Sequence, residues 1–280
     1  MFKARNLRII AANCWQGQRK SGVDWGPSYL TPHIHKNHSD KIVSFDTVNE
    51  TAFHNKNMGF QELHSQTLKN MRDKESMSIV LGGDHSISGA TLAATQNSGD
   101  RSKVIWIDAH ADINTYESSP SGNIHGMPIA CAMHLIQPWV NAPPLKKDDL
   151  IYIGIRDLDP FEKDYIKNEG ITAYFMEDIH DRGISNVMDE VQERIEGENV
   201  HVSFDIDALD MSIVPSTGTP VTNGLTLNDM DTIIDSISSV SNVRHCDFTE
   251  VNPCLGTDKD VDLTVQSMMY VINRTIDKNI

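Results

Sequence analysis

The chain has 280 residues, 39% of them hydrophobic, and a formal net charge of −15. This length and apolar content suffice for one folded core. The negative charge argues against nucleic acid or an anionic membrane surface as partner, because both are negatively charged themselves. It suits a small substrate, including a cationic one.

Apolar runs of strand length alternate with segments of helical spacing along most of the chain. We expect strands at residues 5–13, 41–44, 77–82, 103–108, 150–155, 172–175, 199–206 and 243–249. We expect helices at residues 58–71, 86–97, 126–137, 160–169, 184–196, 226–238 and 260–276. Residues 31–57 have few apolar positions, and we interpret them as loop around one short strand. The alternation predicts one α/β domain over residues 1–280, with a mainly parallel central sheet between two helical layers.

The sequence shows neither targeting nor disulfide signals. The N-terminus is too short and too weakly apolar for a signal peptide, and no later apolar run approaches the length of a membrane span. The cysteines lack C-x-x-C spacing, so we expect reduced thiols. They are Cys14, Cys131, Cys246 and Cys254. We therefore expect a cytoplasmic protein.

Three of the predicted strands end in Asp and His residues. These are Asp84 and His85 after the first strand, Asp108, His110 and Asp112 after the second, and Asp205 and Asp207 at the end of the third. Any one of them could be a turn or helix-capping residue. Together, carboxylates crowded at one sheet edge would repel each other unless a cation neutralised them. His nitrogens with carboxylate oxygens and no nearby Cys favour a divalent ion such as manganese, and the ligands outnumber the needs of one ion.

Three motifs in this order resemble the metal-binding motifs of the ureohydrolase family, which includes arginase, agmatinase and formimidoylglutamase. They are Gly82-Gly83-Asp84-His85-Ser86, Asp108-Ala109-His110-Ala111-Asp112 and Ser203-Phe204-Asp205-Ile206-Asp207. The resemblance is nearest to arginase and implies the arginase/deacetylase-like three-layer fold, two Mn²⁺ ions per subunit and a homo-oligomer, either a trimer or a hexamer. It implies that one ion is bound by His85, Asp108, Asp112 and Asp205 and the other by His110, Asp108, Asp205 and Asp207.

The segment after Asp112 is, by composition, an ordinary polar turn. Its spacing resembles the arginase substrate loop, which implies that the α-carboxylate and α-amino groups of an amino acid are bound by Asn114, Ser119, Ser121 and Asn123. His125 matches the arginase proton-shuttle histidine. The resemblance also assigns substrate contacts to Asp159, with Glu162 beside it, to Thr219 and to Glu250. Read without it, Asp159 is a helix N-cap and Glu250 part of a capping turn.

The reaction implied by the resemblance is hydrolysis of L-arginine to L-ornithine and urea by a hydroxide that bridges two manganese ions. Glu250 would orient the guanidinium, Asp112 would carry a proton to the leaving amine, and His125 would relay protons. Two alternatives stay open. The protein could be an agmatinase or another guanidino or formimino hydrolase, although the Ser and Asn donors favour a substrate with an α-carboxylate. It could also be a non-catalytic metal-binding pseudoenzyme, although the retained His125 and Glu250 argue against this.

Overall fold

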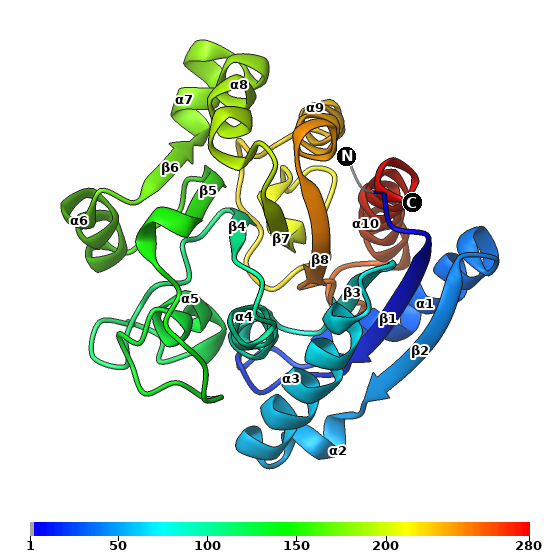
Figure 1. Ribbon diagram of the computed structural model, residues 1–280. Helices are drawn as coiled ribbons and strands as arrows, with labels where there is room; N and C mark the ends of the chain where they lie inside the picture. The colour runs from blue at the N-terminus through cyan, green and yellow to red at the C-terminus, as the bar shows by residue number, and fades with distance from the viewer. Residues whose placement is uncertain (1–2) are drawn as a thin grey trace.

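The computed structural model describes residues 3–280 (Figure 1). Its strands are β1 (Asn6–Ala12), β2 (Ile42–Val48), β3 (Ser76–Gly82), β4 (Ser102–Ile107), β5 (Leu150–Ile155), β6 (Thr172–Phe175), β7 (Asn199–Asp205) and β8 (Asn242–Thr249). Its α-helices are α1 (Gly26–His38), α2 (Glu50–Phe53), α3 (Lys56–Arg72), α4 (Ser88–Asn97), α5 (Pro128–Ala132), α6 (Pro160–Glu169), α7 (Met176–Arg182), α8 (Ile184–Ile195), α9 (Leu227–Val240) and α10 (Asp258–Asn279). Within residues 3–280 no helix is both long and apolar enough to cross a lipid bilayer.

The strands form one parallel sheet in the order β2-β1-β3-β8-β7-β4-β5-β6. Helices cover both of its faces, α1 and α7–α10 on one and α2–α6 on the other (Figure 1). Neighbouring strand residues point to opposite faces, so Ile105 packs into one apolar layer and Trp106 into the other. Strands buried on both sides explain the continuous apolar runs in the sequence. The predicted three-layer α/β/α fold is confirmed.

The interpretation of residues 31–57 as loop was wrong, because α1 and α2 occupy much of that region. Helix α1 begins with Pro27 near its first position and buries Leu30 and Ile34, one turn apart, while its other side is polar. Two apolar residues on one face were too weak a signal amid the polar ones. Pro32 inside the helix also argued for a break.

Two other elements differ from the prediction. The expected helix over 126–137 shrinks to α5, because His134 adopts a left-handed conformation with φ 62° and the chain turns away. Helix α7 was not predicted; it follows β6 directly and buries Met176 and Ile179 against the sheet.

The sheet topology creates one edge where ligands can bind. Because all strands are parallel, their carboxyl ends lie at the same edge of the sheet. β2 and β3 lie on opposite sides of β1, the chain then runs outward from β4 to β6, and β7 and β8 return to fill the sheet between β4 and β3. In open α/β sheets such a change of direction leaves a crevice at the carboxyl ends of the strands.

Candidate active site

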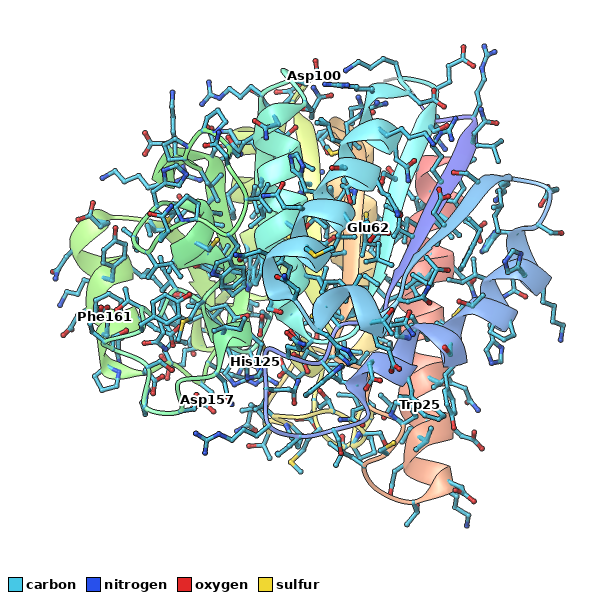
Figure 2. The ribbon with its side chains drawn as sticks, turned by 90° about the horizontal axis from the view of Figure 1, so that it is seen from below. Trp25, Glu62, Asp100, His125, Asp157 and Phe161 are labelled. Carbon is cyan, nitrogen blue, oxygen red and sulfur yellow. The ribbon has the colours of Figure 1, made fainter. Side chains whose placement is uncertain are left out.

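Four adjacent strands, β3, β8, β7 and β4, bring most of the predicted site residues to this crevice, and Asp159 and Glu162 follow the next strand, β5. His85 lies in a short 3-10 helix, η2 (His85–Ile87), after β3, Asp108 directly follows β4, and Asp205 ends β7. Figure 2 shows His125 and Asp157 toward the same end of the molecule, away from Asp100, which precedes β4.

His85 faces three carboxylates. Its Nδ1 lies 3.0 Å from Asp205 Oδ2, 3.1 Å from Asp108 Oδ2 and 3.3 Å from Asp112 Oδ2. The imidazole is fully buried and stacks on Trp106 with ring centroids 4.1 Å apart. The Trp106 indole N–H in turn donates to Asp108 Oδ2. These contacts hold the ring and the central carboxylate in fixed orientations.

His110 forms a second cluster that shares a residue with the first. Its Nδ1 lies 3.4 Å from Asp108 Oδ1 and 3.4 Å from Asp207 Oδ2. Asp108 therefore presents one oxygen to each histidine, which is the geometry of a bridging carboxylate. Thr219 donates to Asp207 Oδ2 at 2.8 Å and fixes that side chain.

The donor atoms of both clusters fit divalent cations. His85 Nδ1 is buried without a well-formed hydrogen bond, although three carboxylate oxygens surround it at about 3 Å. A nitrogen and oxygens bound to one ion at roughly 2.0–2.2 Å lie at such separations from one another. Burial and the charge of Asp108 raise the pKa of Asp112 to about 6, and burial and Asp207 raise the pKa of Asp205. Cations would relieve this repulsion.

Glu250 lies beside the clusters and is almost completely buried. Its Oε1 accepts from the backbone N–H of His85 at 2.9 Å and lies 3.0 Å from His125 Nδ1, while Oε2 accepts from Gln18 Nε2 at 2.6 Å. The residue has φ 69°, a left-handed conformation that is rare outside glycine. Such strain persists where surrounding contacts hold a side chain in one place.

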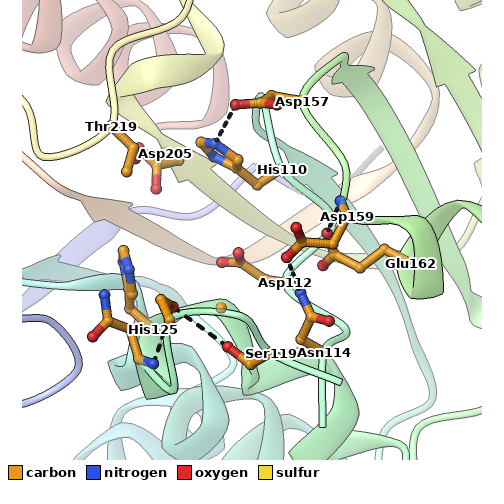
Figure 3. Close-up of a pocket in the computed structure, with 13 residues that line it drawn as sticks. His110, Asp112, Asn114, Ser119, His125, Asp157, Asp159, Glu162, Asp205 and Thr219 are labelled. Carbon is orange, nitrogen blue, oxygen red and sulfur yellow. Dashed lines mark hydrogen bonds and ion pairs between the residues drawn. The ribbon is translucent and has the colours of Figure 1, made fainter. Parts of the chain in front are cut away.

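Sequence reasoning missed two residues of this site. Gln18 lies in the loop after β1, and the loop reaches Glu250 because Gly17 packs against Asp84, where a Cβ would collide with the carboxylate. The signal available in the sequence for this loop was Gly17 within a polar turn. Asp157, two residues before the predicted Asp159, was not among the predicted site residues, yet its Oδ2 lies 3.7 Å from His110 Nε2 (Figure 3).

A cavity of about 240 Å³ opens above the clusters (Figure 3). It is lined by His110, Asp112, Asn114, Ser119, Ser121, Asn123, His125, Gly126, Asp157, Asp159, Glu162, Asp205 and Thr219. The predicted substrate-binding residues other than Glu250 are all in this lining. His85, Asp108, Asp207 and Glu250 lie outside it. Ser119 is half-buried and Ser121 is exposed, and their hydroxyls accept the backbone N–H groups of Gly122 and Asn123.

Asp159 and Glu162 connect this loop to helix α6. Asn114 Nδ2 donates to Asp159 Oδ2 at 2.8 Å, and Glu162 accepts the N–H groups of Ile113 and Asp159. The pair forms a capping box, so the N-cap interpretation of Asp159 holds alongside its place at the cavity. Glu162 thus links the segment after Asp112 to the start of α6.

Comparisons with known proteins agree on one group of enzymes. The family model described as Arginase family matches residues 5–275. An arginase of Bacillus caldovelox is 41% identical over 89% of this chain and 91% of its own length. An arginase of Neurospora crassa is 37% identical over 93% of this chain and 82% of its own. The structure of Entamoeba histolytica arginase in complex with L-ornithine superposes with a TM-score of 0.89 at 30% identity and covers 98% of both chains.

Proposed function

Since the chain belongs to the arginase family, as its three motifs predicted, we propose that it hydrolyses L-arginine to L-ornithine and urea with two Mn²⁺ ions per subunit. Members of this family are metal-dependent hydrolases of the guanidino C–N bond. One observation carries the proposal for this chain: two His/carboxylate clusters that share Asp108 lie under a cavity walled by neutral hydrogen-bond donors and carboxylates.

The proposed ligands divide between the two clusters. One ion would be held by His85, Asp108, Asp112 and Asp205, and the other by His110, Asp108, Asp205 and Asp207. The oxygen and imidazole donors suit manganese better than thiolate-seeking metals. Bound there, the two ions would lower the pKa of water and so supply a nucleophile at neutral pH.

Glu250 would bind and orient the guanidinium. A carboxylate has about four acceptor positions, and Gln18, His85 and His125 use three of them here. One position on Oε2 remains for a guanidinium N–H. A planar guanidinium that engages both oxygens would displace His125 from Oε1. Substrate binding would thereby release His125 for proton transfer.

Asp112 would carry a proton to the departing amine, because an amide anion is a very poor leaving group, and His125 would relay protons to and from bulk water. Its Nδ1 faces Glu250 before substrate binds, which leaves Nε2 as the other proton-carrying ring atom. Burial opposes the charged ring, but the Glu250 carboxylate outweighs it and raises the pKa of His125 to about 9. Before substrate binds, the imidazole therefore holds its proton at neutral pH. Asp112, whose Oδ2 faces His85, has Oδ1 left to hold the proton released by the nucleophile.

The substrate loop supports arginine over agmatine. Asn114, Ser119, Ser121 and Asn123 present amide and hydroxyl groups to the cavity, and these suit an α-carboxylate. Asp159 offers a carboxylate to the α-ammonium group. Agmatine lacks the α-carboxylate and would leave the loop donors unpaired.

The test is urea release from purified, manganese-loaded protein offered L-arginine and agmatine separately, with a His110→Ala, Asp205→Ala double variant as blank. Release from arginine is the expected result. Release from agmatine alone would refute the role of the loop. Silence with both substrates despite bound manganese would refute the proposed activity.

We also propose a cytoplasmic location and a homo-oligomer, either a trimer or a hexamer. The location is supported by the cysteines, whose spacing does not indicate disulfides. Three of the four cysteines are buried as free thiols. The oligomer is supported by family resemblance alone, and its mass in solution tests it.

A further inference from the structure

A fully buried polar network lies in the core beneath the candidate metal centre, between α4 and the two central strands β7 and β8. Register pairs Ser203 with Asp247 and His201 with His245 across the strands. Residues two apart on a strand share a face, so all four side chains point to α4, where Ser88 meets them. None of the five is accessible to solvent.

Asp247 is the anion at the centre of this network. Its Oδ2 accepts from Ser88 Oγ at 2.8 Å and Thr91 Oγ1 at 2.6 Å and lies 3.1 Å from His201 Nε2, while Oδ1 lies 2.8 Å from His245 Nε2. Burial opposes the charge, but the two imidazoles lower the pKa of Asp247 well below its ordinary value. An ionised carboxylate can only accept hydrogen bonds.

The acceptor character of Asp247 fixes the direction of a chain of hydroxyl groups. Ser88 has one hydroxyl proton and donates it to Asp247. Its oxygen must then accept from the Ser203 hydroxyl, 3.1 Å away. Ser203 Oγ, having given its only proton, accepts from His85 Nε2, 2.9 Å away. His85 therefore carries a proton on Nε2, so in the neutral ring the lone pair is on Nδ1, the atom that faces the three carboxylates.

We propose that Asp247 is a positioning residue that selects the metal-binding tautomer of His85 through Ser88 and Ser203. The inference rests on the proposed metal centre and extends it to a residue that touches neither metal ligand nor substrate. A metal ligand must present a lone pair, and the partner of its other ring nitrogen decides which atom has one. Here that partner is linked by hydroxyls to a buried anion on the neighbouring strand.

The energetic cost of Asp247 supports a specific role. A buried carboxylate is costly even when fully hydrogen-bonded, and an apolar residue would pack into this core more cheaply. An Asn at 247 would keep the shape and offer an N–H group to Ser88. The hydroxyl chain could then run in the opposite direction, with Ser203 donating to His85 Nε2. That reversal would place the ring proton on Nδ1, where it blocks the metal.

The experiment compares three variants with the full-length wild type. Asp247→Asn reverses the chain, Ser88→Ala interrupts it, and Thr91→Val removes a donor to Asp247 that is not part of it. Mn²⁺ affinity is measured by competition with a chelator, without substrate. We expect Asp247→Asn and Ser88→Ala to weaken binding by about 10- to 100-fold, as for other outer partners of metal ligands, and Thr91→Val to leave it unchanged.

A second measurement reports the tautomer directly. In ¹⁵N histidine spectra of the zinc-loaded protein, which is diamagnetic, the His85 ring should carry its proton on Nε2 in wild type and Thr91→Val. Wild-type Mn²⁺ affinity in a folded Asp247→Asn variant would overturn the proposal. If the Asp247→Asn variant does not fold, wild-type Mn²⁺ affinity in Ser88→Ala would overturn the proposal instead.

An equal loss of affinity in Thr91→Val would also overturn it, because packing alone would then explain the effect. The result is separable from the proposed activity. A wild type that binds Mn²⁺ but releases no urea would refute arginine hydrolysis, while the ratio of affinities would still decide the role of Asp247.

Discussion

Replacing Gln18 by Met tests whether the loop after β1 belongs to the catalytic machinery. Met keeps the length of Gln but removes the amide N–H that donates to Glu250 Oε2 at 2.6 Å. No other described residue donates to that oxygen, whereas Oε1 keeps its contacts with His85 and His125. A hydrogen bond to a charged group is worth about 1.5–3 kcal/mol. At 1.4 kcal/mol per factor of ten, kcat/KM should fall roughly 10- to 100-fold.

The assay is urea release from L-arginine by manganese-saturated protein, with metal content measured for each variant. Gln16→Met is the matched control, since Gln16 lies in the same loop and its side chain has no hydrogen-bond partner in the described structure. It should leave kcat/KM unchanged. A Gln18→Met variant that binds two ions and keeps wild-type kcat/KM would refute the argument that Gln18 orients Glu250.

Three further predictions concern metal, pH and substrate. Chelation should lower the melting temperature and Mn²⁺ should restore it, since an ion at 100 times its Kd stabilises the folded state by about 2.7 kcal/mol; an unchanged melting curve would contradict the metal centre. Burial and the charge of Asp112 raise the pKa of Glu162 from 4.5 to about 8, so its contribution to stability is complete below pH 4.5 and is lost as pH rises toward 8. Denaturant midpoints of chelated Glu162→Gln should lack that decline, and a slope equal to wild type would count against it. Ser121→Ala and Asn123→Ala should each lower kcat/KM for arginine by about tenfold or more, mainly through KM, if they bind the carboxylate; steady-state kinetics with an unaltered KM would remove them from the site.

The position of the two clusters was predictable because it depends on a simple relation between sequence and sheet. Asp108 and Asp205 each follow an apolar strand, and parallel strands align their carboxyl ends. The family resemblance added the pairing of strands far apart in sequence. Both steps concern residues at the ends of regular elements, where a periodic pattern says which way a side chain points.

The contacts of Glu250 were not predictable in the same way. Gln18 lies 232 positions away in sequence, in a loop whose path depends on Gly17 packing against Asp84. No periodicity describes such a loop. The network around Asp247 was not predictable for a different reason. His245 and Asp247 lie within a buried strand, and only the register with β7 shows that they lie beside His201 and Ser203. Helix α1 was missed because only two residues of its buried face, Leu30 and Ile34, have large apolar side chains.

The central place of β8 determines when the site can form during synthesis. This strand, at Asn242–Thr249, separates β3 from β7 in the sheet, so the part of the chain that carries His85 cannot join the part that carries Asp205 until nearly 250 residues have been made. Contacts this distant in sequence form slowly and leave open sheet edges in the meantime. A nascent or C-terminally truncated chain that lacks β8 would expose two unpaired edges and have no completed metal centre. Cellular quality-control proteins would then meet the unpaired edges of β3 and β7 in any chain whose metal centre is incomplete.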